Sequence, residues 1–254
     1  MTKPRILVTG ATGKTGVVVV TELLKAGYPV RALVHREDGR SAELRTLGAE
    51  IAVADMSDVE RVGNALKDVQ RAYFCPPFDP YMVQGAVAFA VAAKEARLEH
   101  IVGLTQWLAS PSHPSLMTRQ HWLVDRLFSM MSGVAHTIVR PGIFADAYLA
   151  TIGSAVHLGI FPWISGNSRN APPSNEDIAR VAVTALMDPA RHAGEEFMQS
   201  QLSFFELREV QRYGRVNGHP QRDDMTLVVM RVQGSEDFVP KHFGRLPEGM
   251  SQVF

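Results

Sequence analysis

A group of glycines directly after a short apolar stretch constrains the fold of this chain more than any other sequence feature. The stretch Ile6–Val8 has the composition of a buried strand, and an apolar helical pattern later runs to Gly27. Between them lie Gly10, Gly13 and Gly16, at the spacing GxxGxxG. A strand, a glycine turn and a helix in this order open a dinucleotide-binding βαβ unit. There the first glycine permits the tight turn, the second lets a pyrophosphate approach the backbone, and the third lets the helix pack closely.

The same turn invites a second interpretation, because Gly13, Lys14 and Thr15 match the end of the phosphate-binding loop GxxxxGK(S/T). That loop needs a glycine at position 8, where this chain has Val8. We therefore predict that the turn binds a dinucleotide through the helix N-terminus, and a turn that binds nothing is the competing interpretation. Lys14 either contacts the phosphates as a cation or is solvated. The predicted cofactor turn comprises Gly10, Thr12, Gly13, Lys14, Thr15 and Gly16.

The composition is that of an ordinary globular protein. The chain has 254 residues, of which 46% are apolar and 20% are charged. Lys and Arg together number 26, as do Asp and Glu, so no net charge favours nucleic acid or an anionic membrane. The single cysteine, Cys75, excludes an internal disulfide. With no apolar run long enough to span a bilayer and no signal peptide, we expect a cytoplasmic protein.

Strand and helix patterns alternate through the first half of the chain. Further strands are predicted at 29–35, 49–55, 71–75, 100–105 and 135–140, and helices at 57–66, 81–97 and 116–131. This alternation predicts an α/β fold, a Rossmann-type doubly wound parallel sheet with a small C-terminal substrate lobe. Residues 1–145 are predicted to form the dinucleotide-binding domain. Residues 146–254 are predicted to form the lobe, partly packed on the same sheet.

The second half has a looser pattern. The predicted helices there are 148–158, 175–186 and 204–213, the predicted strands are 195–198 and 225–232, and 161–173 is a loop. A lobe at the carboxyl edge of the sheet would lie where open α/β folds bind their ligands.

The end of the second predicted strand bears on cofactor choice. Many NAD sites have an Asp or Glu there, whereas this chain has His35 and Arg36. An arginine can bind a 2′-phosphate bidentately, so we predict NADP(H) in preference to NAD(H). Arg31 and Arg40 are further candidates for this pocket. The competing interpretation is a solvated Arg36 that pairs with Asp38.

Two other strand ends are predicted to meet the cofactor. Asp55 and Met56 follow the third strand and are placed to meet the adenine. Cys75, Pro76 and Pro77 end the fourth strand and are placed beside the ribose and the nicotinamide.

These motifs together resemble those of a known family. GATGKTG after the first strand, HR after the second, AD after the third and RPGIF after the sixth are similar to the NmrA-like, atypical branch of the short-chain dehydrogenase/reductase superfamily. The resemblance covers about residues 5–210. This family includes NADPH-dependent quinone reductases, other small-molecule reductases and NADP-binding regulators. The resemblance therefore implies the cofactor more firmly than the reaction.

The chain departs from the wider superfamily where the chemistry is expected. The resemblance implies a Ser after the fifth strand and a Tyr-x-x-x-Lys pair on the next helix. This chain has Thr105 and Gln106 after the strand, Met117 in the Tyr position and His121 in the Lys position. Methionine donates no proton, so catalysis by a tyrosine is unexpected. His121 either binds the ribose or acts as an acid with a pKa near neutrality, and a partly exposed helix histidine is the alternative.

Aromatic residues on several segments suggest the acceptor. Together they favour a flat, apolar molecule such as a quinone, although each one singly is better explained as a core residue. The predicted substrate residues are Trp107, Trp122, Phe144, Tyr148 and Trp163.

The leading functional hypothesis is an NADPH-dependent reductase of a quinone-like or other apolar carbonyl or enone, by direct hydride transfer. The alternative is a non-enzymatic NADP(H) sensor that binds a protein partner; a homodimer is compatible with either. A sugar-nucleotide epimerase is disfavoured by the missing Tyr. Gln221–Val232 resembles a strand of metal-dependent phosphatases, but we interpret Asp223 and Asp224 as a turn and predict no metal site.

Overall fold

The computed structural model describes residues 3–147 and 172–199. The chain divides into a first unit, Met1–Pro141 with Asn175–Met198, and a second unit, Gly142–Ser174 with Gln199–Phe254. The predicted division into residues 1–145 and 146–254 stays a prediction. Several expected features lie outside the described residues. They are the elements at 148–158, 204–213 and 225–232, most of the loop at 161–173, and the turn at Asp223 and Asp224.

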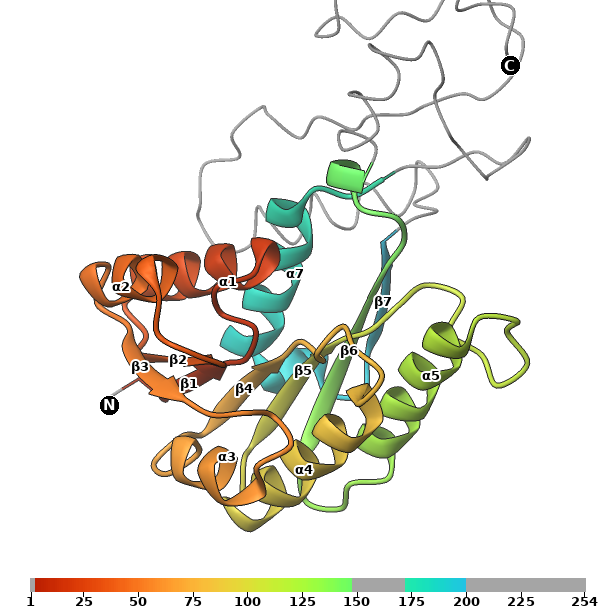
Figure 1. The fold of residues 1–254 in the computed structure, drawn as a ribbon, viewed down its shortest axis with the longest axis horizontal. Helices are drawn as coiled ribbons and strands as arrows, with labels where there is room; N and C mark the ends of the chain where they lie inside the picture. The colour runs from red at the N-terminus through yellow and green to blue at the C-terminus, as the bar shows by residue number, and fades with distance from the viewer. Residues whose placement is uncertain (1–2, 148–171, 200–254) are drawn as a thin grey trace, which may run out of the picture. The chain divides into compact units, whose positions relative to one another are not determined.

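The first unit is built on a parallel sheet with the predicted Rossmann-type winding (Figure 1). The seven strands lie in the order β3-β2-β1-β4-β5-β6-β7, and every pairing from β3 across to β6 is parallel. The strands are β1 (Ile6–Val8), β2 (Val30–Val34), β3 (Glu50–Val53), β4 (Arg71–Phe74), β5 (His100–Leu104), β6 (Ala135–Pro141) and β7 (Glu196–Gln199). The strand order reverses between β1 and β4, which makes their carboxyl ends the expected ligand edge.

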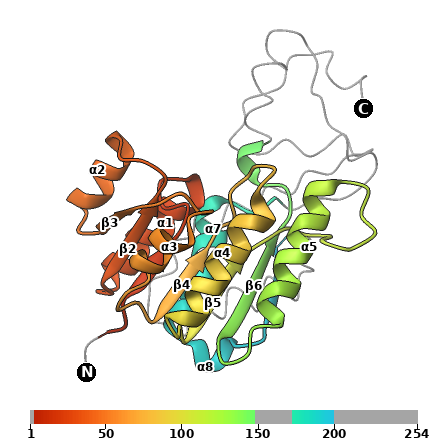
Figure 2. The same ribbon diagram turned by 60° about the horizontal axis from the view of Figure 1, so that its bottom comes forward.

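Helices cover both faces of this sheet. The described helices are α1 (Lys14–Lys25), α2 (Gly39–Thr46), α3 (Val59–Ala65), α4 (Met82–Glu95), α5 (Leu116–Ser129), α7 (Asn175–Met187) and α8 (Pro189–His192). Helices α1 and α7 lie on one face, and α3, α4 and α5 lie on the other (Figures 1 and 2). The predicted strands and helices of the first half agree with these bounds to within a few residues at each end.

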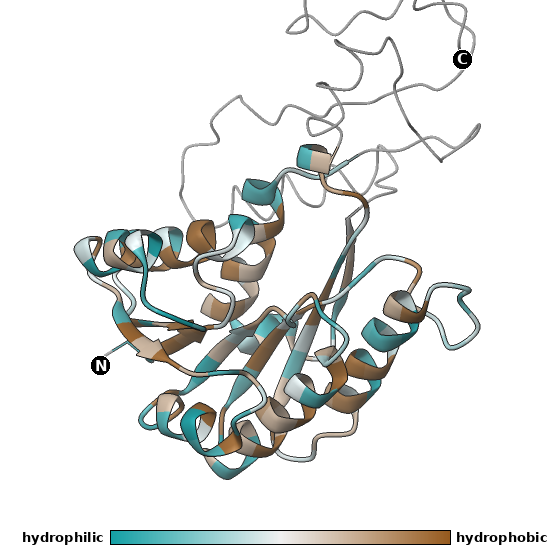
Figure 3. Ribbon diagram, in the orientation of Figure 1, coloured by the Kyte–Doolittle hydropathy of each residue, from teal (hydrophilic) through white to brown (hydrophobic). Residues whose placement is uncertain are grey.

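Buried apolar side chains fill both sides of the sheet, and one continuous cluster joins it to α3, α4 and α5. Because both faces of the sheet are covered, every residue of β1, β2 and β5 is buried. Figure 3 shows hydrophobic residues along these strands and on the inner sides of the helices. Phe74 lies 4.6 Å from Phe89 and 5.2 Å from Phe128 between ring centroids. A Cβ on Gly103 would lie 3.0 Å from the Phe128 ring, so this glycine makes room for the aromatic cluster.

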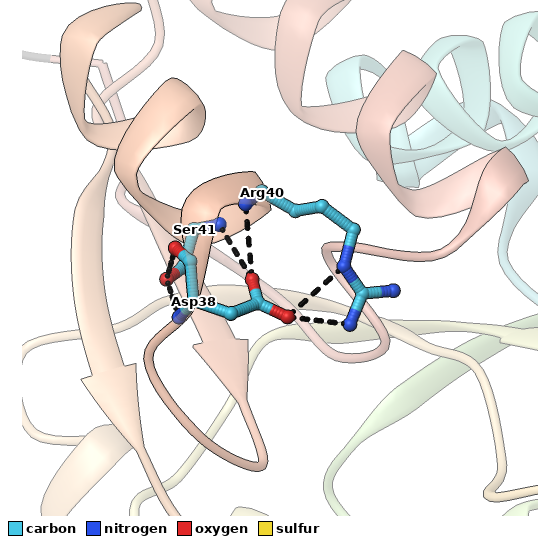
Figure 4. A network of polar contacts seen from close by, with 3 residues as sticks. All are labelled: Asp38, Arg40 and Ser41. Carbon is cyan, nitrogen blue, oxygen red and sulfur yellow. Dashed lines mark hydrogen bonds and ion pairs between the residues drawn. The ribbon is translucent and has the colours of Figure 1, made fainter.

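Helix α2 was missed by the sequence analysis. It begins at a capping box in which the Asp38 carboxylate accepts hydrogen bonds from the N–H groups of Arg40 and Ser41 (Figure 4). The Ser41 hydroxyl in turn accepts from the N–H of Asp38 at 2.9 Å. The helix is short and polar, so its sequence has no apolar periodicity that would predict it. The D-x-x-S spacing, however, is a helix-start signal from which it could have been predicted.

Candidate functional site

The glycine turn after β1 is a tight structure whose glycines have different surroundings. Gly10 has a φ of 59°, in the left-handed region, and its carbonyl accepts a 2.9 Å hydrogen bond from the N–H of Gly13. A Cβ on Gly16 would lie 2.1 Å from the Gly10 carbonyl oxygen, so only glycine lets α1 start against the turn. Among the described residues, a Cβ on Gly13 would meet only that oxygen within 4 Å, at 3.1 Å. The space beyond Gly13 is therefore open to a ligand.

The first turn of α1 presents backbone donors at this place. Within the described part of the chain, the N–H groups of Thr15 and Gly16 have no backbone acceptor. Such N–H groups at a helix N-terminus bind phosphates. The Thr15 side chain faces elsewhere, because its hydroxyl donates a buried 3.1 Å hydrogen bond to Oδ1 of Asn175 on α7. Thr15 can thus serve a phosphate through its backbone, while Thr12 and Lys14 remain at least partly exposed.

The residues after β2 form the second part of the site. His35 and Arg36 are both exposed, and the His35 Nδ1 atom lies 3.6 Å from Oδ2 of Asp55 at the end of β3. Ser57 donates two hydrogen bonds to Asp55 and thereby lowers the pKa of that carboxyl. Arg36 makes no hydrogen bond or ion pair with any other residue in the described ranges. Its guanidinium is accordingly available at the end of β2.

Two further arginines proposed for this pocket are engaged elsewhere. Arg31 is buried and donates hydrogen bonds of 2.6 and 2.7 Å to the carbonyls of Ala65 and Lys67 at the end of α3, so its assignment to the cofactor pocket was wrong. Arg40 pairs with Asp38 at 2.6 Å, and this contact holds the pKa of the carboxyl below its usual value. Asp38 therefore pairs with Arg40 and not with Arg36, as the competing interpretation had it (Figure 4).

The end of β4 is attached to the glycine turn. The buried Thr9 hydroxyl accepts from the N–H of Cys75 at 2.8 Å and donates to its carbonyl at 3.1 Å. This places the Cys75 Cβ atom 3.3 Å from where a Cβ on Gly10 would lie. Burial raises the pKa of the Cys75 thiol to about 11, so the sulfur is neutral at physiological pH. Pro76, which follows, is buried.

Met56 and Pro77, predicted from different strand ends, do come together. Atoms of both side chains lie 3.1–3.3 Å from the position of a Cβ on Gly85 of α4. The loops after β3 and β4 are thus packed on the same helix.

The candidate catalytic residues lie at the end of β5 and on α5. Thr105 is buried, and the Gln106 side-chain oxygen accepts from the Thr118 hydroxyl at 3.4 Å. His121 is only 7% exposed, and this burial lowers its pKa to about 4. The expectations of a partly exposed side chain and of a pKa near neutrality were wrong. His121 is a neutral imidazole at physiological pH, so it can bind a ribose or an acceptor but cannot donate a proton as an imidazolium.

Known proteins resemble this chain in sequence over more than half of its length. The model of the NmrA-like family matches residues 2–152. The chain belongs to the NmrA-like family. It is 34% identical to an NAD(P)H azoreductase from Xenophilus azovorans over 72% of this chain and 64% of that protein. It is 24% identical to quinone oxidoreductase 2 from Escherichia coli over 76% of this chain and 67% of the relative. The chain thus spans about two thirds of the length of these curated relatives.

Solved structures share the fold of this NmrA-like chain. An NADPH-dependent quinone oxidoreductase from Escherichia coli in complex with NADPH superposes with a TM-score of 0.69 at 23% identity, covering 82% of this chain and 74% of the other. Triphenylmethane reductase from Citrobacter sp. in complex with NADP(H) has a TM-score of 0.69 at 21% identity, covering 84% and 76%. At these identities the likeness establishes the fold alone.

The NmrA-like chain also holds a cluster of charged residues around one buried carboxylate, which the sequence analysis missed. Asp125 on α5 is fully buried, and its Oδ2 accepts from Arg140 of β6 at 2.8–2.9 Å. Arg140 also donates a hydrogen bond of 2.6 Å from Nη1 to Oε2 of Glu196 on β7. Burial raises the pKa of Asp125, while Arg140 and the hydroxyl of Thr105 oppose the rise. The cluster connects α5 with the carboxyl ends of β5 and β6 and with the first residue of β7. Its sequence signal was an Asp one helical turn after His121.

The predicted substrate aromatics are only partly accounted for. Trp107 and Trp122 are half-buried in the first unit, and Phe144 is half-buried in the second. Tyr148 and Trp163 lie outside the described residues. Two aromatic side chains that the sequence analysis overlooked, Phe78 and Tyr81, are exposed on the loop after β4. Their position directly after a strand end was the signal.

The described part of the NmrA-like chain contains no cluster of three or more His, Cys, Asp or Glu side chains that could hold a metal ion. Nor does any helix in residues 3–147 and 172–199 have the length and apolarity needed to cross a membrane.

Proposed function

We propose that this NmrA-like protein is an NADPH-dependent oxidoreductase that delivers hydride to a quinone-like or other flat, apolar acceptor. The observation that carries the proposal is the carboxyl edge of the sheet. There, as far as the described residues show, the space at Gly13 is open, the N–H groups that begin α1 have no backbone acceptor, and Arg36 at the end of β2 has no ion-pair partner. The names of two relatives, an NAD(P)H azoreductase and a quinone oxidoreductase, support the same class of reaction.

The residues at this edge fit a phosphorylated dinucleotide. Gly13 leaves room at the turn, and the N–H groups of Thr15 and Gly16, at the N-terminus of α1, supply the kind of donor that a pyrophosphate needs. Arg36 supplies a cation for a 2′-phosphate, and Asp55, which lies 3.6 Å from the preceding residue His35, is already held by Ser57. NADPH, when bound, supplies the hydride.

The neutral state of His121 shapes the proposed chemistry. A neutral imidazole and the Thr105 and Gln106 side chains can orient a ribose or an acceptor by hydrogen bonding. Hydride transfer to a quinone yields a quinol anion that water can protonate, so the reaction does not require a strong protein acid. The absence of a Tyr at position 117 is compatible with such an acceptor.

Met117 also favours one alternative. A chain that lacks the usual proton donor could bind NADP(H) as a regulator and act through a protein partner instead of catalysing a reaction. Both functions need the same cofactor edge, so they differ in turnover and not in cofactor binding.

The full chain should be tested for both properties. We expect NADPH to bind and to be oxidised steadily with naphthoquinones or azo dyes, followed by the loss of NADPH absorbance. Tight NADPH binding without turnover of any acceptor would favour the regulator. Absence of NADPH binding would refute the oxidoreductase and the regulator together.

A further inference from the structure

The loop of residues 75–81, which joins β4 to α4, is attached to the rest of the first unit at three places. At its start, Cys75 makes both of its backbone hydrogen bonds with the Thr9 hydroxyl. In its middle, Pro77 packs with Met56 over Gly85. Near its end, the Pro80 carbonyl accepts a 3.2 Å hydrogen bond from the Gln120 side chain of α5.

Two aromatic side chains stand out from this attached loop. Phe78 is 79% exposed and Tyr81 is 67% exposed. The Asp79 carboxylate accepts from the N–H of Tyr81 at 2.7 Å, which fixes the turn between the two aromatics. The three prolines of the loop restrict its backbone further. Phe78 and Tyr81 are therefore presented to solvent by a constrained backbone.

The loop also spans the distance between the two halves of the proposed site. Its first residue, Cys75, lies against the glycine turn at Gly10. Its far end is bound to Gln120, the residue before His121. Two more exposed apolar side chains follow the neighbouring strand β5: Leu108, 55% exposed, lies on the loop, and Leu116, 63% exposed, is the first residue of α5.

Exposed apolar side chains are common when they are scattered singly over a surface. Here four lie between the ends of two adjacent strands and the first turns of the helices that follow, at the edge where open α/β sheets bind ligands. Large rings kept in water are unfavourable, and a flat aromatic ligand that stacks on them would remove that penalty.

We infer that Phe78 and Tyr81 form an aromatic platform on which a flat conjugated acceptor stacks, and that they set the preference for such acceptors. The inference rests on the proposed reductase function. It assigns the acceptor's binding energy to this platform, while the cofactor is held by the glycine turn and Arg36. The platform therefore acts on the affinity for the acceptor and leaves NADPH binding alone.

The test measures steady-state kinetics of the full chain with naphthoquinone and with a small aliphatic enone. Phe78→Ala and Tyr81→Ala should each raise the KM for naphthoquinone by about three- to tenfold with little change in kcat. The KM for the aliphatic enone and the Kd for NADPH, titrated without acceptor, should not change. Tyr81→Phe keeps the ring and should raise the naphthoquinone KM less than Tyr81→Ala does, whereas Phe78→Leu keeps apolar volume without the ring and should resemble Phe78→Ala.

Met130→Ala provides the matched control. Met130 is 81% exposed and follows the C-terminal end of α5, so it lies at the opposite edge of the sheet, and its loss should leave every constant unchanged. Melting curves confirm that each variant is folded. An unchanged naphthoquinone KM in both alanine variants of an active enzyme overturns the platform and leaves the reductase standing. The platform is also overturned if the alanine variants weaken binding of the aliphatic enone and of NADPH as much as they weaken binding of naphthoquinone. A wild type that binds NADPH but reduces no flat acceptor overturns the reductase and the platform with it.

Discussion

The hydroxyl of Thr15 and the Oδ1 atom of Asn175 form a buried hydrogen bond of 3.1 Å between the first turn of α1 and the first residue of α7. Both residues are less than one tenth exposed. The two helices cover the same face of the sheet (Figure 1). The bond therefore fixes the start of α1, whose N–H groups are those proposed to bind the pyrophosphate, relative to a helix that lies far away in sequence.

Replacing Thr15 with valine tests what this bond does. Thr15→Val keeps the shape of the side chain and removes only the donor, so the unfolding free energy should fall by about 1–3 kcal/mol. Because the helix start is less well held, the NADPH Kd should rise by about two- to tenfold. Thr21→Val is the control, since Thr21 lies on the same helix and bonds only to the carbonyl of Val17 at 2.8 Å. An equal rise of the NADPH Kd in both variants would argue against a specific role for the bond to Asn175.

Gly13 and Gly16 should respond differently to an added side chain. Gly16→Ala places a Cβ 2.1 Å from the Gly10 oxygen, so α1 must shift, and both the melting temperature and NADPH binding should fall. Gly13→Val meets that oxygen only at 3.1 Å, and its φ of −79° suits any residue, so the fold should survive while the ligand space is filled. Melting curves and NADPH titrations distinguish the two. Near-normal NADPH affinity in Gly13→Val would refute the glycine-turn assignment.

Local patterns explain how much of this fold could be predicted. The strand Ile6–Val8, the glycine spacing and the alternation of strands and helices are visible in short stretches of sequence, and they gave the sheet and its winding. Arg31 was misjudged because its partners, the carbonyls of Ala65 and Lys67, are more than thirty residues away in sequence. The pKa of His121 was misjudged for a similar reason, since tertiary packing sets its burial. Position in an element predicted where a side chain lies, but not what it contacts.

Arg36 should decide the choice between the two nicotinamide cofactors. Arg36→Ala removes the cation proposed for the 2′-phosphate, and the loss of a charge-assisted pair costs about 1.5–3 kcal/mol, so NADPH should bind about ten- to a hundredfold more weakly. NADH lacks that phosphate and should bind nearly as before. Arg45→Ala removes the same charge from an exposed ion pair with Glu37 and serves as control. Calorimetric titration with both cofactors gives the ratio of their dissociation constants. An equal loss of affinity for NADPH and NADH would contradict the role of Arg36.

The neutral His121 leads to a pH prediction for turnover. Since burial holds its pKa at about 4, its protonation does not change near neutral pH. The pH profile of kcat/KM for a quinone should therefore show no step from His121 above about pH 5.5, and His121→Gln should keep the shape of the profile. The variant should weaken NADPH or acceptor binding if the imidazole orients either one. A step between about pH 6 and 7 that is present in the wild type and lost in the variant would show that the histidine titrates as an acid after all.

Buried histidines should also make the fold sensitive to mild acid. Nε2 of His100 donates a 2.9 Å hydrogen bond to the Thr137 hydroxyl, which itself donates to the carbonyl of His192. Burial, aided by Arg71 and by His136 and His192, lowers the pKa of His100 to about 4 from the usual 6.5, as burial alone does for His121.

The sign of the effect follows from these shifts. The unfolded chain takes up protons below about pH 6.5 and the folded chain only near pH 4, so stability is full at neutral pH and falls as the pH drops between these values. From about pH 7 to pH 5, each of the two histidines should remove about 2 kcal/mol of unfolding free energy. The raised pKa of Asp125 acts in the opposite direction, and carboxyls with lowered pKa values, such as Asp38, matter only at lower pH. Urea unfolding at several pH values measures the slope, and His121→Gln should remove the share of His121, while the lowered pKa values of His136 and His192 still contribute. An unfolding free energy that stays constant between about pH 7 and pH 5 would mean that these histidines are not held neutral in the folded protein.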